Sequence, residues 1–144
     1  MATIKVGVAG FAYKDWAGIV YPEKLSSKLR IEYLARYLSL VEINTSFYGH
    51  IKPSVGKQWW RMAAAANADF TFTAKLNRAF THSPAAIVES TSAKTIRPGP
   101  DDERDAKLGL DSLAEERMLG AVLAQFPISF KCTDENQAYV EDLV

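Results

Sequence analysis

The sequence predicts an α/β fold on a parallel sheet, because four stretches of strand pattern alternate with four stretches of helix pattern. Strands that alternate with helices pair in parallel through right-handed crossovers. The carboxyl ends of such strands meet at one edge of the sheet, and ligands of this fold class bind there. We therefore look for functional side chains at the ends of the strands.

The first unit is a strand over residues 4–10 and a helix over residues 28–38. The strand is β-branched and ends in Gly10, which permits a sharp exit from the sheet. Ser26 or Ser27 is expected to cap the helix. The helix carries one apolar face at i, i+3, i+4 and i+7, made by Ile31, Leu34, Ala35 and Leu38.

The second unit begins with a strand of alternating polarity over residues 41–44. Pro53 is well placed in the first turn of the following helix, because its fixed φ suits that position. Trp59 and Trp60 point in different directions on this helix. We expect one of them in the core and the other half covered.

The third unit has a strand over residues 69–75 and an irregular stretch over residues 76–118. Within that stretch, Asp101 or Asp102 is expected to cap an acidic helix. The residues expected to face inward from it are Leu110, Leu113 and Ala114.

The fourth unit is a strand over residues 119–126 that ends at Pro127, followed by a helix from Thr133 or Asp134.

Composition is that of one soluble globular domain, with 48% hydrophobic and 24% charged residues in 144 residues. A formal net charge of zero excludes a global field that draws the protein to nucleic acid or to anionic membranes. The charge is uneven, because residues 1–100 are basic and residues 101–144 are acidic. The two parts attract each other, and a basic surface on the first could still meet a phosphate.

The single cysteine, Cys132, excludes an intrachain disulfide and a cysteine zinc cluster. The first residues run directly into a strand without the pattern of a signal peptide, and no apolar run reaches membrane-spanning length. We expect a cytoplasmic protein without a membrane partner.

Polar side chains lie at or near the ends of three neighbouring strands. Glu42 and Asn44 are on the second strand, Thr73 and Lys75 on the third, and Gln125 on the fourth. Glu42 could act as a general acid or base, and Lys75 could neutralise an anionic substrate. Asn44 and Gln125 could orient a hydroxyl or a carbonyl group. The alternative is structural, because Glu42 and Lys75 could satisfy each other as a buried ion pair.

Aromatic side chains follow the first two strands. Tyr13 and Trp16 lie after the first strand, and Phe47 and Tyr48 after the second. They either cap the sheet or line a pocket, where they could stack on a sugar or a base. His82 is a further candidate acid or base, with a packing or surface role as the alternative.

No metal and no cofactor is predicted. The two histidines, His50 and His82, are not in a ligand-spaced pair. No glycine-rich phosphate loop or nucleophile elbow is present in the sequence.

Several segments resemble the YecE-like proteins, the family of the domain of unknown function 72. They are residues 10–16 with Tyr21-Pro22, residues 41–48, Pro53 with Trp59, residues 70–75 with Thr81-His82, and residues 123–130. The resemblance implies a TIM-type (β/α) barrel with the motif residues at its carboxyl mouth. The resemblance does not identify a reaction.

Family members are about twice this length, so residues 1–144 resemble the N-terminal half of such a barrel, with four β-α units. Half a barrel leaves two strand edges unpaired. The chain is therefore expected to be a truncated product or a fragment. Alternatively, it pairs as a homodimer through its strand edges, or survives as an open sheet.

Three functions remain open from the sequence. The first is a hydrolase or lyase acting on a phosphorylated, sugar or nucleic-acid substrate at the mouth. The second is a non-catalytic module that binds a nucleic acid or nucleotide, and the third is an inactive remnant. Whether the chain is an enzyme is left open by the sequence.

Overall fold

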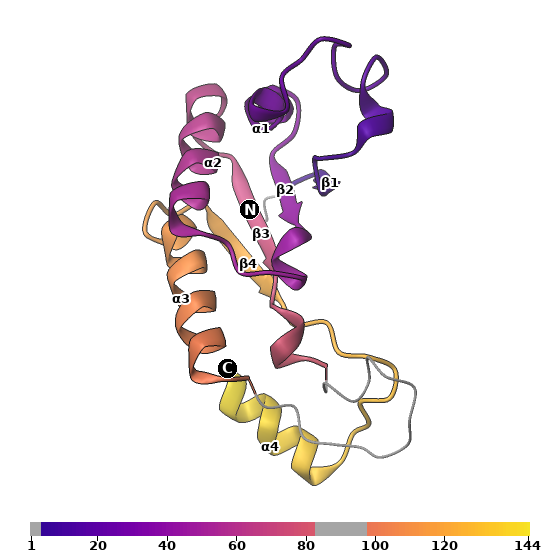
Figure 1. The fold of residues 1–144 in the computed structure, drawn as a ribbon, viewed down its shortest axis with the longest axis vertical. Coiled ribbons are helices and arrows are strands. Elements are labelled where there is room, and N and C mark those ends of the chain that lie inside the picture. Colours follow the sequence, from indigo (N-terminus) through magenta and orange to yellow (C-terminus); the bar gives the residue numbers. More distant parts are fainter. Residues whose placement is uncertain (1–3, 83–97) are drawn as a thin grey trace.

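The strands form one four-stranded parallel sheet in the order β1-β2-β3-β4. The computed structural model of the chain describes residues 4–82 and 98–144. Figure 1 shows the sheet with the helices that connect its strands. The predicted alternation of strands and helices and their parallel pairing are confirmed. The strands are β1 (Gly7–Ala9), β2 (Leu40–Ile43), β3 (Thr71–Lys75) and β4 (Leu119–Leu123).

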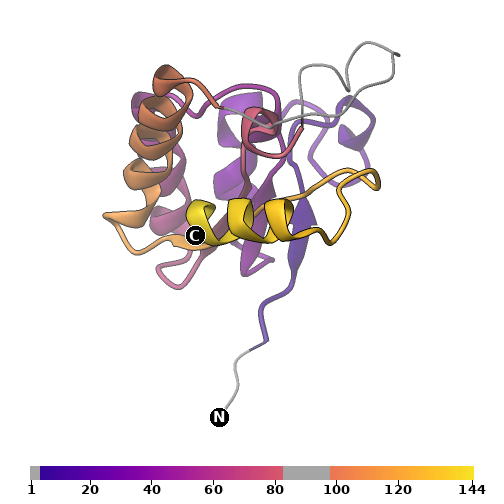
Figure 2. The same cartoon turned by 90° about the horizontal axis from the view of Figure 1, so that it is seen from below.

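The longer helices lie on one side of this sheet. Figure 1 shows α2 above α3, both to the left of the strands, and α2 packs against both α3 and α1. The last helix, α4, lies near the end where β3 finishes, and its Tyr139 hydroxyl donates to the carbonyl of Phe80 at 2.8 Å (Figures 1 and 2). The helices are α1 (Arg30–Ala35), α2 (Pro53–Ala66), α3 (Pro100–Ala114) and α4 (Asp134–Leu143).

The core lies on the helix-covered face of the sheet. Side chains alternate between the two faces of a strand, so every second residue of β2 and β3 points to the helices. Four of these are fully buried, namely Val41, Ile43, Phe72 and Ala74. The side chains between them point to the other face, called here the inner face, and are only half-buried. They are Leu40, Glu42, Thr71, Thr73 and Lys75.

Small residues let α2 and α3 come close together. A Cβ atom on Gly56 of α2 would lie 1.9 Å from the Oγ of Ser112 on α3. That hydroxyl donates to the carbonyl of Gly109 at 2.6 Å, so it cannot simply swing away. A glycine in a helix costs about 1 kcal/mol relative to alanine, and close packing offsets that cost here.

Two of the expected helix caps are wrong. Ser26 and Ser27 do not cap α1, because the turn η2 (Ser27–Leu29) comes first and Ser26 makes no capping hydrogen bond. Gly99, not an aspartate, is the N-cap of α3, because Pro100 with its fixed φ already occupies the first helical position. Asp102 instead accepts a hydrogen bond from the amide of Gly99 at 3.0 Å.

The start expected for the last helix is confirmed, because α4 begins at Asp134, and the Thr133 hydroxyl caps it by accepting a hydrogen bond from the amide of Asn136 at 3.3 Å. The exit at Gly10 is also confirmed by its φ of +89°.

Two expectations about the apolar faces need correction. Ala114 is exposed, and the buried positions of α3 include Ser112 beside Leu113. Trp59 and Trp60 are both half-buried, so neither lies fully in the core. The acidic helix expected within the stretch over residues 76–118 is confirmed as α3, while residues 83–97 of that stretch lie outside the described residues.

A search of the described helices finds none that is long and apolar enough to cross a bilayer.

Candidate functional site

Glu42 and Lys75 lie on the inner face of the sheet, on neighbouring strands. Glu42 is opposite Thr73 in the parallel register of β2 and β3, and Lys75 follows Thr73 by two residues. All three side chains therefore point to the same face and are half-buried. The alternation of side chains along the strands thus brings a carboxylate and an ammonium group to the same face, near the carboxyl ends of β2 and β3.

The two charged groups do not neutralise each other. No ion pair within 4.0 Å joins Glu42 to Lys75, although both side chains belong to the described residues. The buried ion pair considered as a structural alternative is therefore not formed. Both groups keep hydrogen-bonding capacity that a ligand on this face could use.

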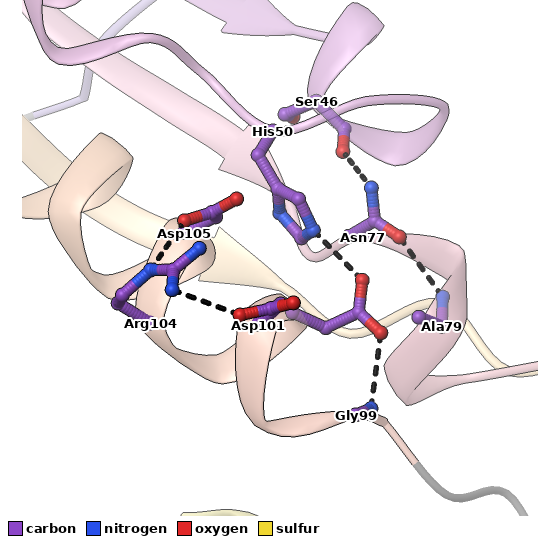
Figure 3. A network of polar contacts seen from close by, with 9 residues as sticks. Ser46, His50, Asn77, Ala79, Gly99, Asp101, Arg104 and Asp105 are labelled. Atoms are coloured by element: carbon purple, nitrogen blue, oxygen red, sulfur yellow. Dashed lines mark hydrogen bonds and ion pairs between the residues drawn. The ribbon is translucent and has the colours of Figure 1, made fainter.

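The turns after β2 and β3 are tied together by small polar side chains. The Ser46 hydroxyl lies 2.7 Å from the carbonyls of both Ile43 and Lys75, and it can donate to one of them at a time. The Asn77 amide donates to the carbonyl of Ser46 at 3.2 Å, and its oxygen accepts from the amide of Ala79 at 3.0 Å (Figure 3). These bonds fix the two strand ends beside each other.

Sequence reasoning missed Ser46 and Asn77. Their only signal was their type, because short polar side chains directly after a strand bond to nearby main chain.

An aromatic and cationic cluster forms on these two turns. The ring of Phe47 lies edge-on to His82 at 5.2 Å and to Tyr48 at 5.1 Å between centroids. Tyr48 is 73% exposed, and the Arg78 guanidinium lies 5.9 Å from its ring centroid. The Nδ1 of His82 is 2.9 Å from the Thr81 hydroxyl. Three residues predicted to be functional are thus brought together, and Arg78 joins them.

Tyr13 and Trp16 form a separate group beside β1. The centroids of their rings are 4.9 Å apart, and the ring of Trp16 also packs against that of the buried Tyr21, with 5.7 Å between centroids. The Tyr13 hydroxyl donates to the carbonyl of Ala9 at 2.7 Å, so Tyr13 closes the end of the first strand. The Arg30 guanidinium lies 4.8 Å from the ring centroid of Tyr21, and burial raises the pKa of that phenol.

Asn44 and Gln125 are not bonded to the charged pair. Asn44 begins the turn η3 (Thr45–Phe47) as its N-cap, and its side-chain oxygen is occluded without a hydrogen-bond partner among the described residues. Gln125 is exposed and lies two residues beyond the end of β4. No hydrogen bond joins the side chains of these two residues to Glu42 or Lys75 in the described structure.

The sequence analysis also did not predict a histidine–aspartate pair that the structure contains. The Nε2 of His50, before α2, lies 3.0 Å from the Oδ1 of Asp102 in the first turn of α3. The hydrogen bond with His50, and next the one from the amide of Gly99, hold the pKa of the Asp102 carboxyl below its usual range. A spacing of 52 residues gives no local signal for such a pair.

A small cavity lies behind this pair, between the end of β3 and α3. It has room for about one water molecule and is lined in part by Ser46, His50, Asn77 and Leu110. Lys75 also lines this cavity, whereas Glu42 does not. Among the described residues, no group of three or more histidine, cysteine or carboxylate side chains could hold a metal ion.

Comparison with protein families gives one match that spans nearly the whole chain. The model described as "Protein of unknown function DUF72" matches residues 5–144. Among curated proteins, the UPF0759 protein YunF of Bacillus subtilis (strain 168) is 27% identical over 138 residues. That alignment covers 95% of this chain and 44% of YunF.

Solved structures of the same family share the fold. A DUF72 family protein from Thermotoga maritima MSB8 superposes with a TM-score of 0.69 at 29% identity, covering 96% of this chain and 50% of that one. A DUF72 family protein from Enterococcus faecalis V583 gives 0.70 at 22% identity, covering 98% and 46%. The chain thus spans about half the length of these relatives, and its four β-α units form part of a TIM-like barrel.

Proposed function

This chain belongs to the DUF72 family of proteins of unknown function, and from that premise we propose that the inner face at the carboxyl ends of β2 and β3 is a substrate site. The reaction is that of a hydrolase or lyase on a phosphorylated, sugar or nucleic-acid substrate. The observation that carries the proposal is the placement of Glu42 and Lys75 on one face without an ion pair between them. Charges left unpaired in a half-buried position are costly unless a ligand uses them.

Each group has a role in this proposal. Glu42 transfers the proton as general acid or base, and Lys75 neutralises negative charge on the substrate or transition state. His82 is a second proton donor or acceptor, on the turn that follows β3. Asn44 and Gln125 orient the substrate, after a movement that frees the occluded Asn44 oxygen.

In this proposal the aromatic residues line the substrate site. Phe47 and Tyr48 lie on the turn after β2, and Tyr13 and Trp16 lie beside β1. Their rings suit the flat face of a sugar or a base. In this proposal the partner is a small-molecule or nucleic-acid ligand. The protein is cytoplasmic and has no membrane partner.

The test uses substitutions that remove charge without changing shape. Glu42→Gln and Lys75→Met are each expected to abolish turnover while the far-UV circular dichroism spectrum stays unchanged. A panel of phosphomonoesters, aryl glycosides and oligonucleotides identifies the substrate class. Full activity in both variants on a substrate of the unmodified chain would contradict the site.

A second candidate is a non-catalytic module that binds a nucleotide or nucleic acid. It is favoured by Arg78, whose guanidinium lies over the exposed ring of Tyr48. A cation beside an exposed aromatic ring can bind a phosphate and a stacked base together. Binding without turnover, weakened by salt, is the expected signature of this function.

A third candidate is a remnant without activity of its own. Residues 1–144 would then be the N-terminal half of a barrel, taken from a longer protein, and half of the site would be missing. The share of YunF that the chain covers, 44%, supports this reading. Absence of both binding and turnover, in a chain shown to be folded, is its expected signature.

A further inference from the structure

The arginine beside an aromatic ring at the strand ends differs from the other pairs of this kind. Three such pairs lie among the described residues, namely Arg30 with Tyr21, Arg61 with Trp60 and Arg78 with Tyr48. The distance from guanidinium carbon to ring centroid is largest in the last pair, at 5.9 Å. Its ring is 73% exposed, whereas Tyr21 is 2% exposed and Trp60 is half-buried. This pair is therefore the most accessible of the three to a ligand.

The gap between Arg78 and Tyr48, called here the ring clamp, is close to the width that a flat ring needs. Carbon atoms pack at about 3.5 Å, so a ring held between two flat groups separates them by about 7 Å. From 5.9 Å the ring clamp has to open by only about 1 Å. Arg78 is exposed and has no carboxylate of the described residues within 4.0 Å, so it is free to make this movement.

The ring of Tyr48 is supported from behind. The half-buried Phe47 packs edge-on against Tyr48 and against His82, with 5.1 and 5.2 Å between centroids. The hydroxyl of the buried Thr81 lies 2.9 Å from Nδ1 of His82 and orients that imidazole. Tyr48 is thus the fixed wall of the ring clamp, and Arg78 is the mobile one.

Toward the mouth, the inner face presents first a carboxylate, then an ammonium group and then the ring clamp. Glu42 is opposite Thr73 in the register of β2 and β3. Lys75 lies two residues further along β3, about 7 Å nearer the carboxyl end. Arg78 follows three residues later, so its Cα lies at most about 11 Å from that of Lys75. Along the chain the ammonium group therefore comes between the carboxylate and the ring clamp.

Buried hydrogen bonds keep the ring clamp and Lys75 together. Ser46, two residues before Tyr48, has its hydroxyl 2.7 Å from the carbonyl of Lys75. The Asn77 amide, next to Arg78, donates to the carbonyl of Ser46 at 3.2 Å (Figure 3). Both Ser46 and Asn77 are buried, so water does not compete for these bonds. A ligand that reaches from the ring clamp to Lys75 therefore meets a preorganised surface.

We propose that the substrate of the inner-face site is a nucleotide, with its base between Tyr48 and Arg78 and its phosphate on Lys75. The inference deepens the proposed function and rests on it, because it selects one substrate class for the same site. A base is a flat ring that stacks on an aromatic side chain. A phosphate supplies the anion that Lys75 lacks among the described residues.

The other two substrate classes use only part of this surface. A sugar carries no anion for Lys75, and a phosphorylated sugar carries no aromatic ring for the ring clamp. A free nucleotide and the end of a nucleic-acid strand share the same unit of base and phosphate. The experiments below distinguish these two sources.

The first test is titration calorimetry of the unmodified chain with AMP, ribose 5-phosphate and adenosine. These ligands carry the whole unit, the phosphate without the base, and the base without the phosphate. We expect AMP to bind at least about tenfold more tightly than either of the others, as for one stacked base or one phosphate contact. Equal affinity for AMP and ribose 5-phosphate, or no binding of AMP, overturns the inference.

The position of the base is tested with Tyr48→Leu, which removes the exposed ring. We expect AMP to bind about tenfold more weakly and ribose 5-phosphate to bind as before. Tyr48→Phe keeps the ring and should keep the affinity for AMP. Tyr37→Leu is the matched control, because Tyr37 is 71% exposed but precedes β2, at the opposite end of that strand. An unchanged affinity for AMP in Tyr48→Leu, or an equal loss in Tyr37→Leu, overturns the inference.

The position of the phosphate is tested with Lys75→Met. This variant should bind AMP and ribose 5-phosphate more weakly by the same factor, about tenfold, because both lose the same charged contact. Lys57→Met on α2 is the matched control and should bind both ligands as the unmodified chain does. An affinity for AMP that Lys75→Met leaves unchanged overturns the inference.

A dinucleotide with a 5′-phosphate distinguishes the two sources of the unit. Tighter binding than that of AMP assigns the site to the end of a strand, and equal or weaker binding assigns it to a free nucleotide. In both cases Tyr48→Leu should weaken the binding. Dinucleotide binding that Tyr48→Leu leaves unchanged overturns the inference.

These outcomes are separable from those of the proposed function. Binding of AMP in the expected pattern, with full activity of Glu42→Gln and Lys75→Met, refutes the proposed reaction and leaves the base in the ring clamp. Turnover that requires both Glu42 and Lys75, in a chain that does not bind AMP, refutes the nucleotide and leaves the proposed function in place.

Discussion

Glu42 and Lys75 lie on the same face of the sheet, on adjacent strands and two residues apart in register, and they form no ion pair. The strands fix this placement, because Val41 and Ile43 must face the helices and so turn Glu42 the other way. The same alternation in β3 sets Lys75 beside it. Core packing on one face therefore positions the polar groups on the other.

Removing either charge should stop catalysis without unfolding the chain. We expect Glu42→Gln to lower turnover by about 100-fold or more, the usual effect of losing a general acid or base. Lys75→Met should cost a similar factor and should weaken binding of an anionic substrate most. Glu32→Gln and Lys57→Met, on α1 and α2, are matched controls that should leave turnover unchanged.

Replacing Gly56 should separate α2 from α3. In Gly56→Ala the new Cβ would lie 1.9 Å from the Ser112 Oγ, and such overpacking costs about 1–3 kcal/mol in the free energy of unfolding. Urea unfolding followed by circular dichroism measures it. Gly49→Ala is the control, since its Cβ would meet no atom within 4 Å. Adding Ser112→Ala should recover part of the loss, and equal stability of both alanine variants would refute the close contact.

The His50–Asp102 pair should make stability depend on pH in the acid range. The pKa of Asp102 is lowered in the folded chain, chiefly by its hydrogen bond with His50. Its contribution is therefore present above the ordinary carboxyl pKa of 3.8 and is lost as the pH falls through the lower folded value.

We expect Asp102→Asn to destabilise the chain at neutral pH by about 1 kcal/mol or less, since the side chain is 38% exposed. The difference from the unmodified chain should shrink as the pH falls below 3.8. Urea unfolding at a series of pH values measures it. Asp101→Asn, at the preceding position with a side chain that is 82% exposed, is the control and should change the free energy of unfolding at neutral pH less than Asp102→Asn does.

Arg78 should contribute to nucleotide binding if the second candidate function holds. Arg78→Ala is expected to weaken binding of ADP about tenfold, because it removes a cation beside an exposed ring. Arg61→Ala is a matched control, because Arg61 lies 5.4 Å from the ring centroid of Trp60 on α2, away from the strand ends. Titration calorimetry at two salt concentrations measures both variants. An equal loss in the two variants would show that Arg78 has no special role.

Much of the fold could be predicted because its signals are local. The alternation in β2 and β3 assigned the buried residues to the correct face, and Gly10 marked a real turn. The N-caps predicted for α1 and α3 were wrong because several adjacent residues in the sequence could serve as the cap. At α3 the fixed φ of Pro100 decided between them.

The candidate site was predictable only in part. Strand position alone placed Glu42 and Lys75 on one face, but it could not tell whether they pair. The contact of His50 with Asp102 and that of Arg78 with Tyr48 depend on how separate turns pack, and no spacing in the sequence encodes them. Gln125 lies past the end of β4 because that strand ends at Leu123, earlier than its apolar pattern indicated.

The most direct measurement of the central claim is an amide-resolved NMR titration of the chain with inorganic phosphate and then with p-nitrophenyl phosphate. We predict that shift changes centre on Glu42, Thr73 and Lys75, and that they disappear in Lys75→Met. Changes confined to the helix-covered face, or unaltered by Lys75→Met, would contradict a substrate site on the inner face.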